Sequence, residues 1–302
     1  MRTQNLNNQR KGCLYVVLAA ALWAVSGTTA KFLFNAGVTP FQLVQLRSTI
    51  AAVAVACWVL LGRRGLLRIE RKDLPYFAVL GAILAAVHFT YLYAISRIQV
   101  AAAILLQYQA PVFVVLFSVF VKRRKPLLST IVTVAGAVAG CYIMTGGYDI
   151  NVFALNKAGV SAGLASAAVF ALYAVASEYG MRSYSPWTVL FYALSFGAFL
   201  WNVFQPPLSA FAVPYSAASW CGIFFVGIFG TAVAFGLYNE GIRLIGATRA
   251  SITAILEPVI AGVVSYFFIG EKAELMQMAG AALIVASILL LQTRKKVYAH
   301  GE

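Results

Sequence analysis

Two apolar segments of the chain each contain a proline with polar residues before it. In the first segment the polar run Gln107–Gln109 comes before Pro111, and in the second Glu257 comes directly before Pro258. A proline lacks the backbone N–H and clashes with the carbonyl one turn earlier, so the helix around it must break or kink. In lipid, such breaks and polar groups are stable only against protein or a water-filled cavity. The pattern predicts a buried polar site, with Pro111 and Pro258 as hinges of the helices that form it.

Two charged residues lie at membrane depth. Glu257 is about ten residues into its segment, which places it near the middle of a bilayer at about 1.5 Å per residue. It could bind a substrate ammonium group or a proton, or it could brace the broken helix at Pro258. Arg47 is about seven residues into another segment, where it could hold a substrate carboxylate or pair with backbone carbonyls as scaffold.

Further candidates for the same cavity are polar and aromatic residues. His88 and Tyr91 are three residues apart and so share one helix face. A histidine there could bind substrate or accept a proton near neutral pH, or it could be a core histidine that bonds a neighbouring hydroxyl. The remaining candidates lie at comparable depth, and the aromatic ones among them could equally be packing residues: Gln107, Tyr108, Trp23, Phe170 and Tyr173.

These residues must be positioned by membrane-spanning helices. Of the 302 residues, 62% are hydrophobic and 11% are charged, whereas soluble domains are about 45–50% apolar. A spanning helix needs about 20 apolar residues. Ten segments meet this requirement: 12–34, 40–62, 74–96, 99–121, 127–146, 157–181, 186–205, 216–242, 247–269 and 274–292. The links are short, so the prediction is an all-α polytopic membrane protein with no separate enzymatic or nucleic-acid-binding domain.

The net charge of +14 fits a membrane topology better than a nucleic-acid partner. Of the 23 lysines and arginines, 18 lie in the segments that share a side with the N-terminus, four lie in the opposite segments and Arg47 lies inside a span. Lysine and arginine accumulate in cytoplasmic loops. We therefore expect a multi-pass protein of the inner (plasma) membrane with both termini in the cytoplasm.

The two halves of the chain repeat each other at a nearly constant spacing. Each half has five predicted spans, so the second half crosses the membrane in the opposite sense and forms an inverted repeat, with a site expected at the interface. We predict one membrane domain made of residues 1–146 and 147–302. The matched positions are Pro40-Phe41 with Pro186-Trp187, Leu92-Tyr93 with Leu237-Tyr238, Pro111 with Pro258, Ser118 with Ser265, and Ala135–Ala137 with Ala279–Ala281.

Five short motifs occur along the chain, namely Trp23–Gly27, Leu46-Arg47, Ala110–Val112, Glu257-Pro258 and Gly270-Glu271. In order and in register, over nearly the whole chain, they resemble the EamA family of the drug/metabolite transporter superfamily. The resemblance implies a ten-helix carrier of small metabolites, often an amino-acid exporter, with a central cavity between its halves. One departure is that the first half has Arg123-Arg124 where the second has Gly270-Glu271.

The leading hypothesis is therefore a secondary transporter that exports amino acids or similar small amphiphilic metabolites by alternating access through a central cavity. Its expected partners are this small-molecule substrate, the lipid bilayer and, as a further candidate, a proton. An organophosphate or nucleotide-sugar antiporter is an alternative, but it should present two or more basic groups to the cavity. A non-transporting membrane scaffold or sensor is another. No Gly-x-Ser-x-Gly, His-Glu-x-x-His or Walker motif indicates an enzyme or an ATP-driven pump. The four cysteines are single, so no cofactor, metal site or disulfide framework is predicted.

Overall fold

The computed structural model describes residues 2–121, 123, 125–150, 155–269 and 274–293, and their regular secondary structure is helical. The motif pair Gly270-Glu271 lies outside the described residues. The first half contains α1 (Arg2–Asn35), α2 (Pro40–Gly62), α3 (Leu74–Arg97), α4 (Val100–Gln107), α5 (Ala110–Phe120) and α6 (Leu128–Met144). The second contains α7 (Lys157–Gly180), α8 (Pro186–Phe204), α9 (Ala217–Gly227), α10 (Ala234–Ile245), α11 (Ala247–Ala254), α12 (Leu256–Ile269) and α13 (Leu275–Thr293).

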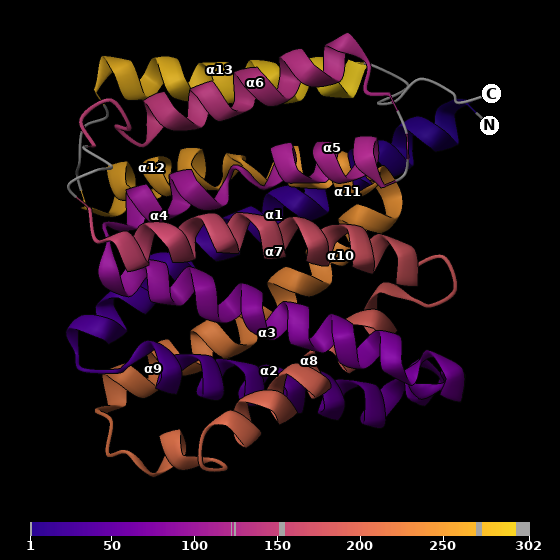
Figure 1. Cartoon of the computed structure of the whole chain (residues 1–302), viewed down its shortest axis with the longest axis vertical. Helices are drawn as coiled ribbons and strands as arrows, with labels where there is room; N and C mark the ends of the chain where they lie inside the picture. The colour runs from indigo at the N-terminus through magenta and orange to yellow at the C-terminus, as the bar shows by residue number, and fades with distance from the viewer. Residues whose placement is uncertain (1, 122, 124, 151–154, 270–273, 294–302) are drawn as a thin grey trace.

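In this part of the chain, nine helices or helix pairs are long and apolar enough to cross a membrane, and α6 is a tenth, shorter apolar helix. Together they match the ten predicted spans. The all-α fold with five spans in each half is therefore confirmed. Figure 1 shows α1 beginning and α13 ending at the same end of the molecule, as an even number of crossings requires.

The corresponding helices α2 and α8 both begin at a side-chain cap. The Thr39 side chain accepts from the Gln42 backbone N–H while the Gln42 side chain accepts from the Thr39 N–H, which is a capping box in front of Pro40. In the second half Ser185 caps the start of α8 in the same way in front of Pro186, by accepting from the Thr188 N–H. Both prolines occupy the first helical position, where the missing N–H removes no helical hydrogen bond.

Two spans are interrupted at the prolines that the sequence singles out. The fourth span consists of α4 and α5, separated at Tyr108 and Gln109, with Pro111 in the first turn of α5. The ninth consists of α11 and α12, separated at Ile255, with Glu257 in the first turn of α12. A third irregularity was not predicted: one π-helical turn, Ile228–Val233, joins α9 to α10.

Helices of the two halves pack in pairs that the repeat relates. The third span of one half lies along the first span of the other, so α3 packs on α7 and α1 packs on α10. The equivalent helices α2 and α8 pack on each other, and so do α6 and α13. The last pair approaches closely, since a Cβ on Gly140 would lie 2.9 Å from the Gly280 carbonyl oxygen. Gly136 and Gly140, four residues apart on α6, therefore form a close-packing face that contacts α13 of the same chain.

Candidate functional site

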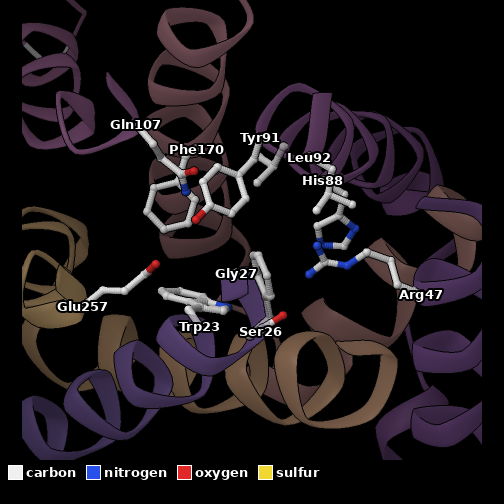
Figure 2. A pocket seen from close by; sticks show the side chains of 12 residues that line it. Trp23, Ser26, Gly27, Arg47, His88, Tyr91, Leu92, Gln107, Phe170 and Glu257 are labelled. Carbon is white, nitrogen blue, oxygen red and sulfur yellow. The ribbon is translucent and has the colours of Figure 1, made fainter. Parts of the chain in front are cut away.

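A small cavity lies where the two halves meet near the helix breaks (Figure 2). Its volume is about 30 Å³, against roughly 300–1,000 Å³ for a typical ligand pocket. It can hold a water molecule or two but no metabolite. In this structure a metabolite would therefore fit the cavity only if its walls moved apart. The walls are Trp23, Ser26, Gly27, Arg47, Val87, His88, Tyr91, Leu92, Gln107, Phe170, Phe235 and Glu257.

Seven of the predicted substrate-binding residues line this cavity, namely Trp23, Arg47, His88, Tyr91, Gln107, Phe170 and Glu257. Tyr108 and Tyr173 do not. Tyr108 is buried in the break between α4 and α5 and bonds Glu257, while Tyr173 is buried on α7 and donates to the Asn239 side chain at 3.1 Å. The structure thus brings the predicted residues together, but their part in substrate binding stays a prediction.

Glu257 connects the two helix breaks. Its carboxylate Oε2 accepts a hydrogen bond of 2.5 Å from the Tyr108 hydroxyl, and the side chain is buried with 3% exposure. It lies in the first turn of α12, where unpaired backbone N–H groups favour a negative charge. The bracing role and the ligand role are therefore compatible, because the carboxylate also faces the cavity (Figure 2).

Arg47 is anchored to the π-helical turn. Its Nε donates to the Thr231 hydroxyl at 2.9 Å, and Nη2 donates to the Gly230 carbonyl at 3.4 Å. Thr231 in turn donates to the Val226 carbonyl, five residues back. A π turn departs from the α-helical hydrogen-bond ladder, and Arg47 bonds one hydroxyl and one carbonyl within it. The scaffold interpretation of Arg47 thus has direct contacts, while the guanidinium also lines the cavity.

His88 is held between a hydroxyl and an aromatic ring. Its Nδ1 lies 3.4 Å from the Ser48 hydroxyl, and the Phe235 ring meets the imidazole edge to face at 5.2 Å. Nε2 has no hydrogen-bond partner in the described residues. His88 therefore offers one free ring nitrogen at the cavity.

Trp23 is the centre of an aromatic cluster on one side of the cavity. Its indole meets the rings of Phe170, Phe235 and Tyr238 at centroid distances of 5.7, 5.1 and 5.2 Å. Phe170 and Tyr238 stack at 5.3 Å. These contacts join α1 of the first half to α7 and α10 of the second, so the cluster closes the interface as well as shaping the site.

Several buried polar atoms around the cavity lack partners. Within the described residues, Trp23 Nε1, His88 Nε2, Tyr91 Oη and Gln107 Oε1 have no hydrogen-bond partner within 3.5 Å. An unpaired buried polar group costs about 1–3 kcal/mol. Water or a bound ligand would pair these groups.

Sequence reasoning missed Phe235 and Thr231. Phe235 lies two residues before the Leu237-Tyr238 pair that the repeat had already aligned, so inspecting that helix face could have identified it. Thr231 gave no signal, because a π turn cannot be recognised from apolar residues alone.

In the described residues no group of three or more His, Cys, Asp or Glu side chains gathers as metal ligands.

Comparison with known proteins is consistent with this architecture. A transporter of Archaeoglobus fulgidus, named an uncharacterized transporter, is 32% identical over 93% of this chain and 96% of its own. The inner membrane transporter YicL of Salmonella typhimurium, also described as uncharacterized, is 27% identical over 95% of this chain and 96% of its own. A probable terminal-alkyne amino-acid exporter of Streptantibioticus cattleyicolor is 26% identical over 92% of each chain.

The fold also occurs in a solved structure. A crystal structure with 21% sequence identity superposes with a TM-score of 0.73 and covers 93% of this chain and 96% of its own. Residues 10–146 and 157–293 each match the EamA-like transporter family. With a cavity between two matched halves and relatives named as transporters, the chain is a multi-pass membrane transporter rather than an enzyme, and it belongs to the EamA-like transporter family.

Proposed function

We propose that this transporter exports amino acids or similar small amphiphilic metabolites by alternating access, with the central cavity as the substrate site. The observation that carries the proposal is the placement of one acidic and one basic side chain on the same cavity. Figure 2 shows Glu257 and Arg47 on opposite sides of the pocket. An α-amino acid carries an ammonium and a carboxylate on one carbon, and this pair of charges is complementary to it.

The aromatic and polar walls support the same substrate class. Trp23 and Phe170 offer apolar surface for a side chain, while Tyr91 and Gln107 have unpaired polar atoms. The relative named a probable terminal-alkyne amino-acid exporter agrees with this class. An organophosphate or nucleotide-sugar substrate is less well matched, because Arg47 is the one cationic side chain among the described residues that line the cavity.

Alternating access is supported by contacts that tie the halves together at both ends. Near the start of α3, Tyr76 donates to the Ala176 carbonyl of α7 at 2.7 Å and Tyr184 donates to the Asp73 carboxylate at 2.5 Å. At the opposite end the Gln45 amide donates to Asn202 of α8 at 3.1 Å. Opening either end requires breaking one of these sets while the other holds.

We infer from the basic-residue asymmetry that the Tyr76 and Tyr184 end faces the cytoplasm together with both termini. As an exporter in this orientation, the protein would take substrate from that end and release it at the Gln45 and Asn202 end. The YicL relative is named as an inner membrane protein, which agrees with the same location for this chain.

A transport assay in proteoliposomes tests the proposal. We expect counterflow of at least one member of a panel of radiolabelled L-amino acids. An unlabelled compound should compete with it only if that compound carries both an ammonium group and a carboxylate. The amide of the transported amino acid, which lacks the carboxylate, and the corresponding deaminated acid should each compete at least tenfold more weakly. Absence of counterflow over the whole panel, or equal competition by the deaminated acid, would contradict an amino-acid substrate.

A further inference from the structure

A second, larger pocket lies away from the central cavity. Its volume is about 540 Å³, and it lies at the end of the molecule where α2 and α7 end and α8 begins, on the right in Figure 1. Both halves contribute walls, with Trp58 and Arg63 from the first half and Arg182, Trp187 and Arg243 from the second. None of these residues takes part in the central site.

The pocket carries an excess of positive charge. Arg63, Arg182 and Arg243 line it together with one acidic residue, Glu240. Glu240 is already paired, because Arg243 donates to its Oε2 through Nε at 3.1 Å and through Nη2 at 2.8 Å. Two guanidinium groups remain without a carboxylate in the described residues.

Those two guanidinium groups are oriented by aromatic rings. Arg63 lies over the Trp58 ring at 5.9 Å, and Arg182 lies over the Tyr179 ring at 5.6 Å. A cation–π contact restrains an arginine without neutralising its charge. The donors of Arg63 and Arg182 are thus held at the pocket and remain free for an anion.

An apolar strip leads to the same pocket. The Trp58 and Trp187 rings pack at a centroid distance of 4.8 Å at its wall. Leu61 is three residues after Trp58 and so lies on the same face of α2. Its side chain is 88% exposed, and acyl chains cover such an apolar face in a bilayer. Tryptophans near span ends occupy the headgroup level of the membrane. Phosphate-binding groups and an acyl-chain surface therefore adjoin at the depth where a phospholipid has both.

We propose that this pocket binds the headgroup of an anionic phospholipid, with Arg63 and Arg182 on its phosphate and the Trp58 and Leu61 face against its acyl chains. A soluble anion would use the arginines but would gain nothing from the apolar strip. Because both halves line the pocket, a bound lipid stabilises the end at which they meet.

Native mass spectrometry of the full-length protein in detergent tests this proposal. The protein is titrated with phosphatidylglycerol and, separately, with phosphatidylcholine of the same acyl chains. Wild type should bind phosphatidylglycerol more tightly. The double variant Arg63→Gln with Arg182→Gln should bind it about 30-fold more weakly, because each arginine near a membrane surface contributes about a factor of five.

Two further variants make the result specific. Arg97→Gln is the matched control. Arg97 also lies over an aromatic ring, that of Tyr93 at 5.2 Å, but it is outside the pocket. The Arg97→Gln variant should bind phosphatidylglycerol as tightly as wild type. Ser183→Glu adds a negative charge to the pocket without removing a cation–π contact, and it should weaken phosphatidylglycerol binding even if the double variant fails to fold.

Several outcomes would overturn the proposal. Equal affinity for the two lipids would show that the pocket does not recognise an anionic headgroup. Unchanged binding in both Ser183→Glu and the double variant would place the lipid elsewhere. A soluble anion can be tested with sodium phosphate or glycerol 3-phosphate in a thermal stability assay. If these compounds stabilise wild type but not the double variant, and phosphatidylglycerol does not stabilise wild type, the pocket is a soluble-anion site instead.

Discussion

The Tyr108 hydroxyl donates a hydrogen bond of 2.5 Å to the Glu257 carboxylate, and the two residues are 149 positions apart. Tyr108 lies in the break between α4 and α5, and Glu257 lies in the first turn after the break between α11 and α12. The bond therefore joins the two interrupted spans of the inverted repeat. A movement that bends one break must either carry the other with it or break this contact.

Replacing Tyr108 by Phe removes this bond and keeps the ring. A hydrogen bond to a charged group contributes about 1.5–3 kcal/mol, so we expect a clear fall in transport rate with a smaller fall in folded yield. Tyr108→Ala should reduce flux further because it also leaves a cavity. Size-exclusion yield and counterflow, measured on the same preparations, check this. If Tyr108→Ala abolishes folding, or if flux does not change, Tyr108 is a packing residue or has no role.

Glu257→Gln separates the charge of the carboxylate from its shape. Glutamine can still accept from Tyr108, so the folded yield should be close to that of wild type, while any step that needs ionisation should be lost. We expect a lower maximal flux and a flattened dependence of flux on pH. A pH profile identical to that of wild type would leave Glu257 with the role of bracing the break at Pro258.

Pro258→Ala tests the predicted hinge. Alanine supplies the N–H that proline lacks, so the helix ladder can close and the bend should become stiffer. We expect slower interconversion between access states, with substrate affinity within a few fold of wild type. Pro111→Ala is the matched variant in the other half. Single-turnover efflux and equilibrium binding distinguish the two effects, and a large loss of affinity with an unchanged rate would argue against a hinge.

The contact between Tyr184 and Asp73 is expected to hold the two halves together at the end of the molecule where α2 and α7 end. The hydrogen bond to the Asp73 carboxylate raises the pKa of Tyr184 above its ordinary value of about 10. The proton is therefore retained at neutral pH, and the contact is lost as the pH rises through that raised pKa. Tyr184→Phe removes the contact at every pH.

In Tyr184→Phe we expect this end to open more often. A cysteine introduced at the buried Ser177, in a background without native cysteines, should react faster with an impermeant thiol reagent added on that side. Tyr179→Phe is the control, because its exposed ring stays beside Arg182. Equal rates in the two variants would mean that the Tyr184 contact does not close this end.

The predicted topology can be tested with single cysteines at Gln4 and Gly301 in the same background. Both should react with an impermeant reagent only after cells are permeabilised. Labelling of either position from outside intact cells would contradict the assignment of both termini to the cytoplasm.

The sequence alone was enough to predict the all-α fold, the ten spans and the two broken helices. These features depend on local physics: lipid requires about 20 apolar residues per span, and a proline interrupts a helix wherever it stands in the interior. The spacing between Pro111 and Pro258 also revealed the repeat, since matched breaks need no knowledge of contacts.

Only the tertiary structure decided how the candidate residues are used. Tyr108 and Tyr173 looked like wall residues, yet Tyr108 bonds Glu257 and Tyr173 bonds Asn239 behind the wall, while Phe235 entered the wall unpredicted. Rotation of each helix about its axis, and hence which face meets the cavity, depends on packing between helices of different halves. In a span that is apolar all round, hydrophobic periodicity does not encode that rotation.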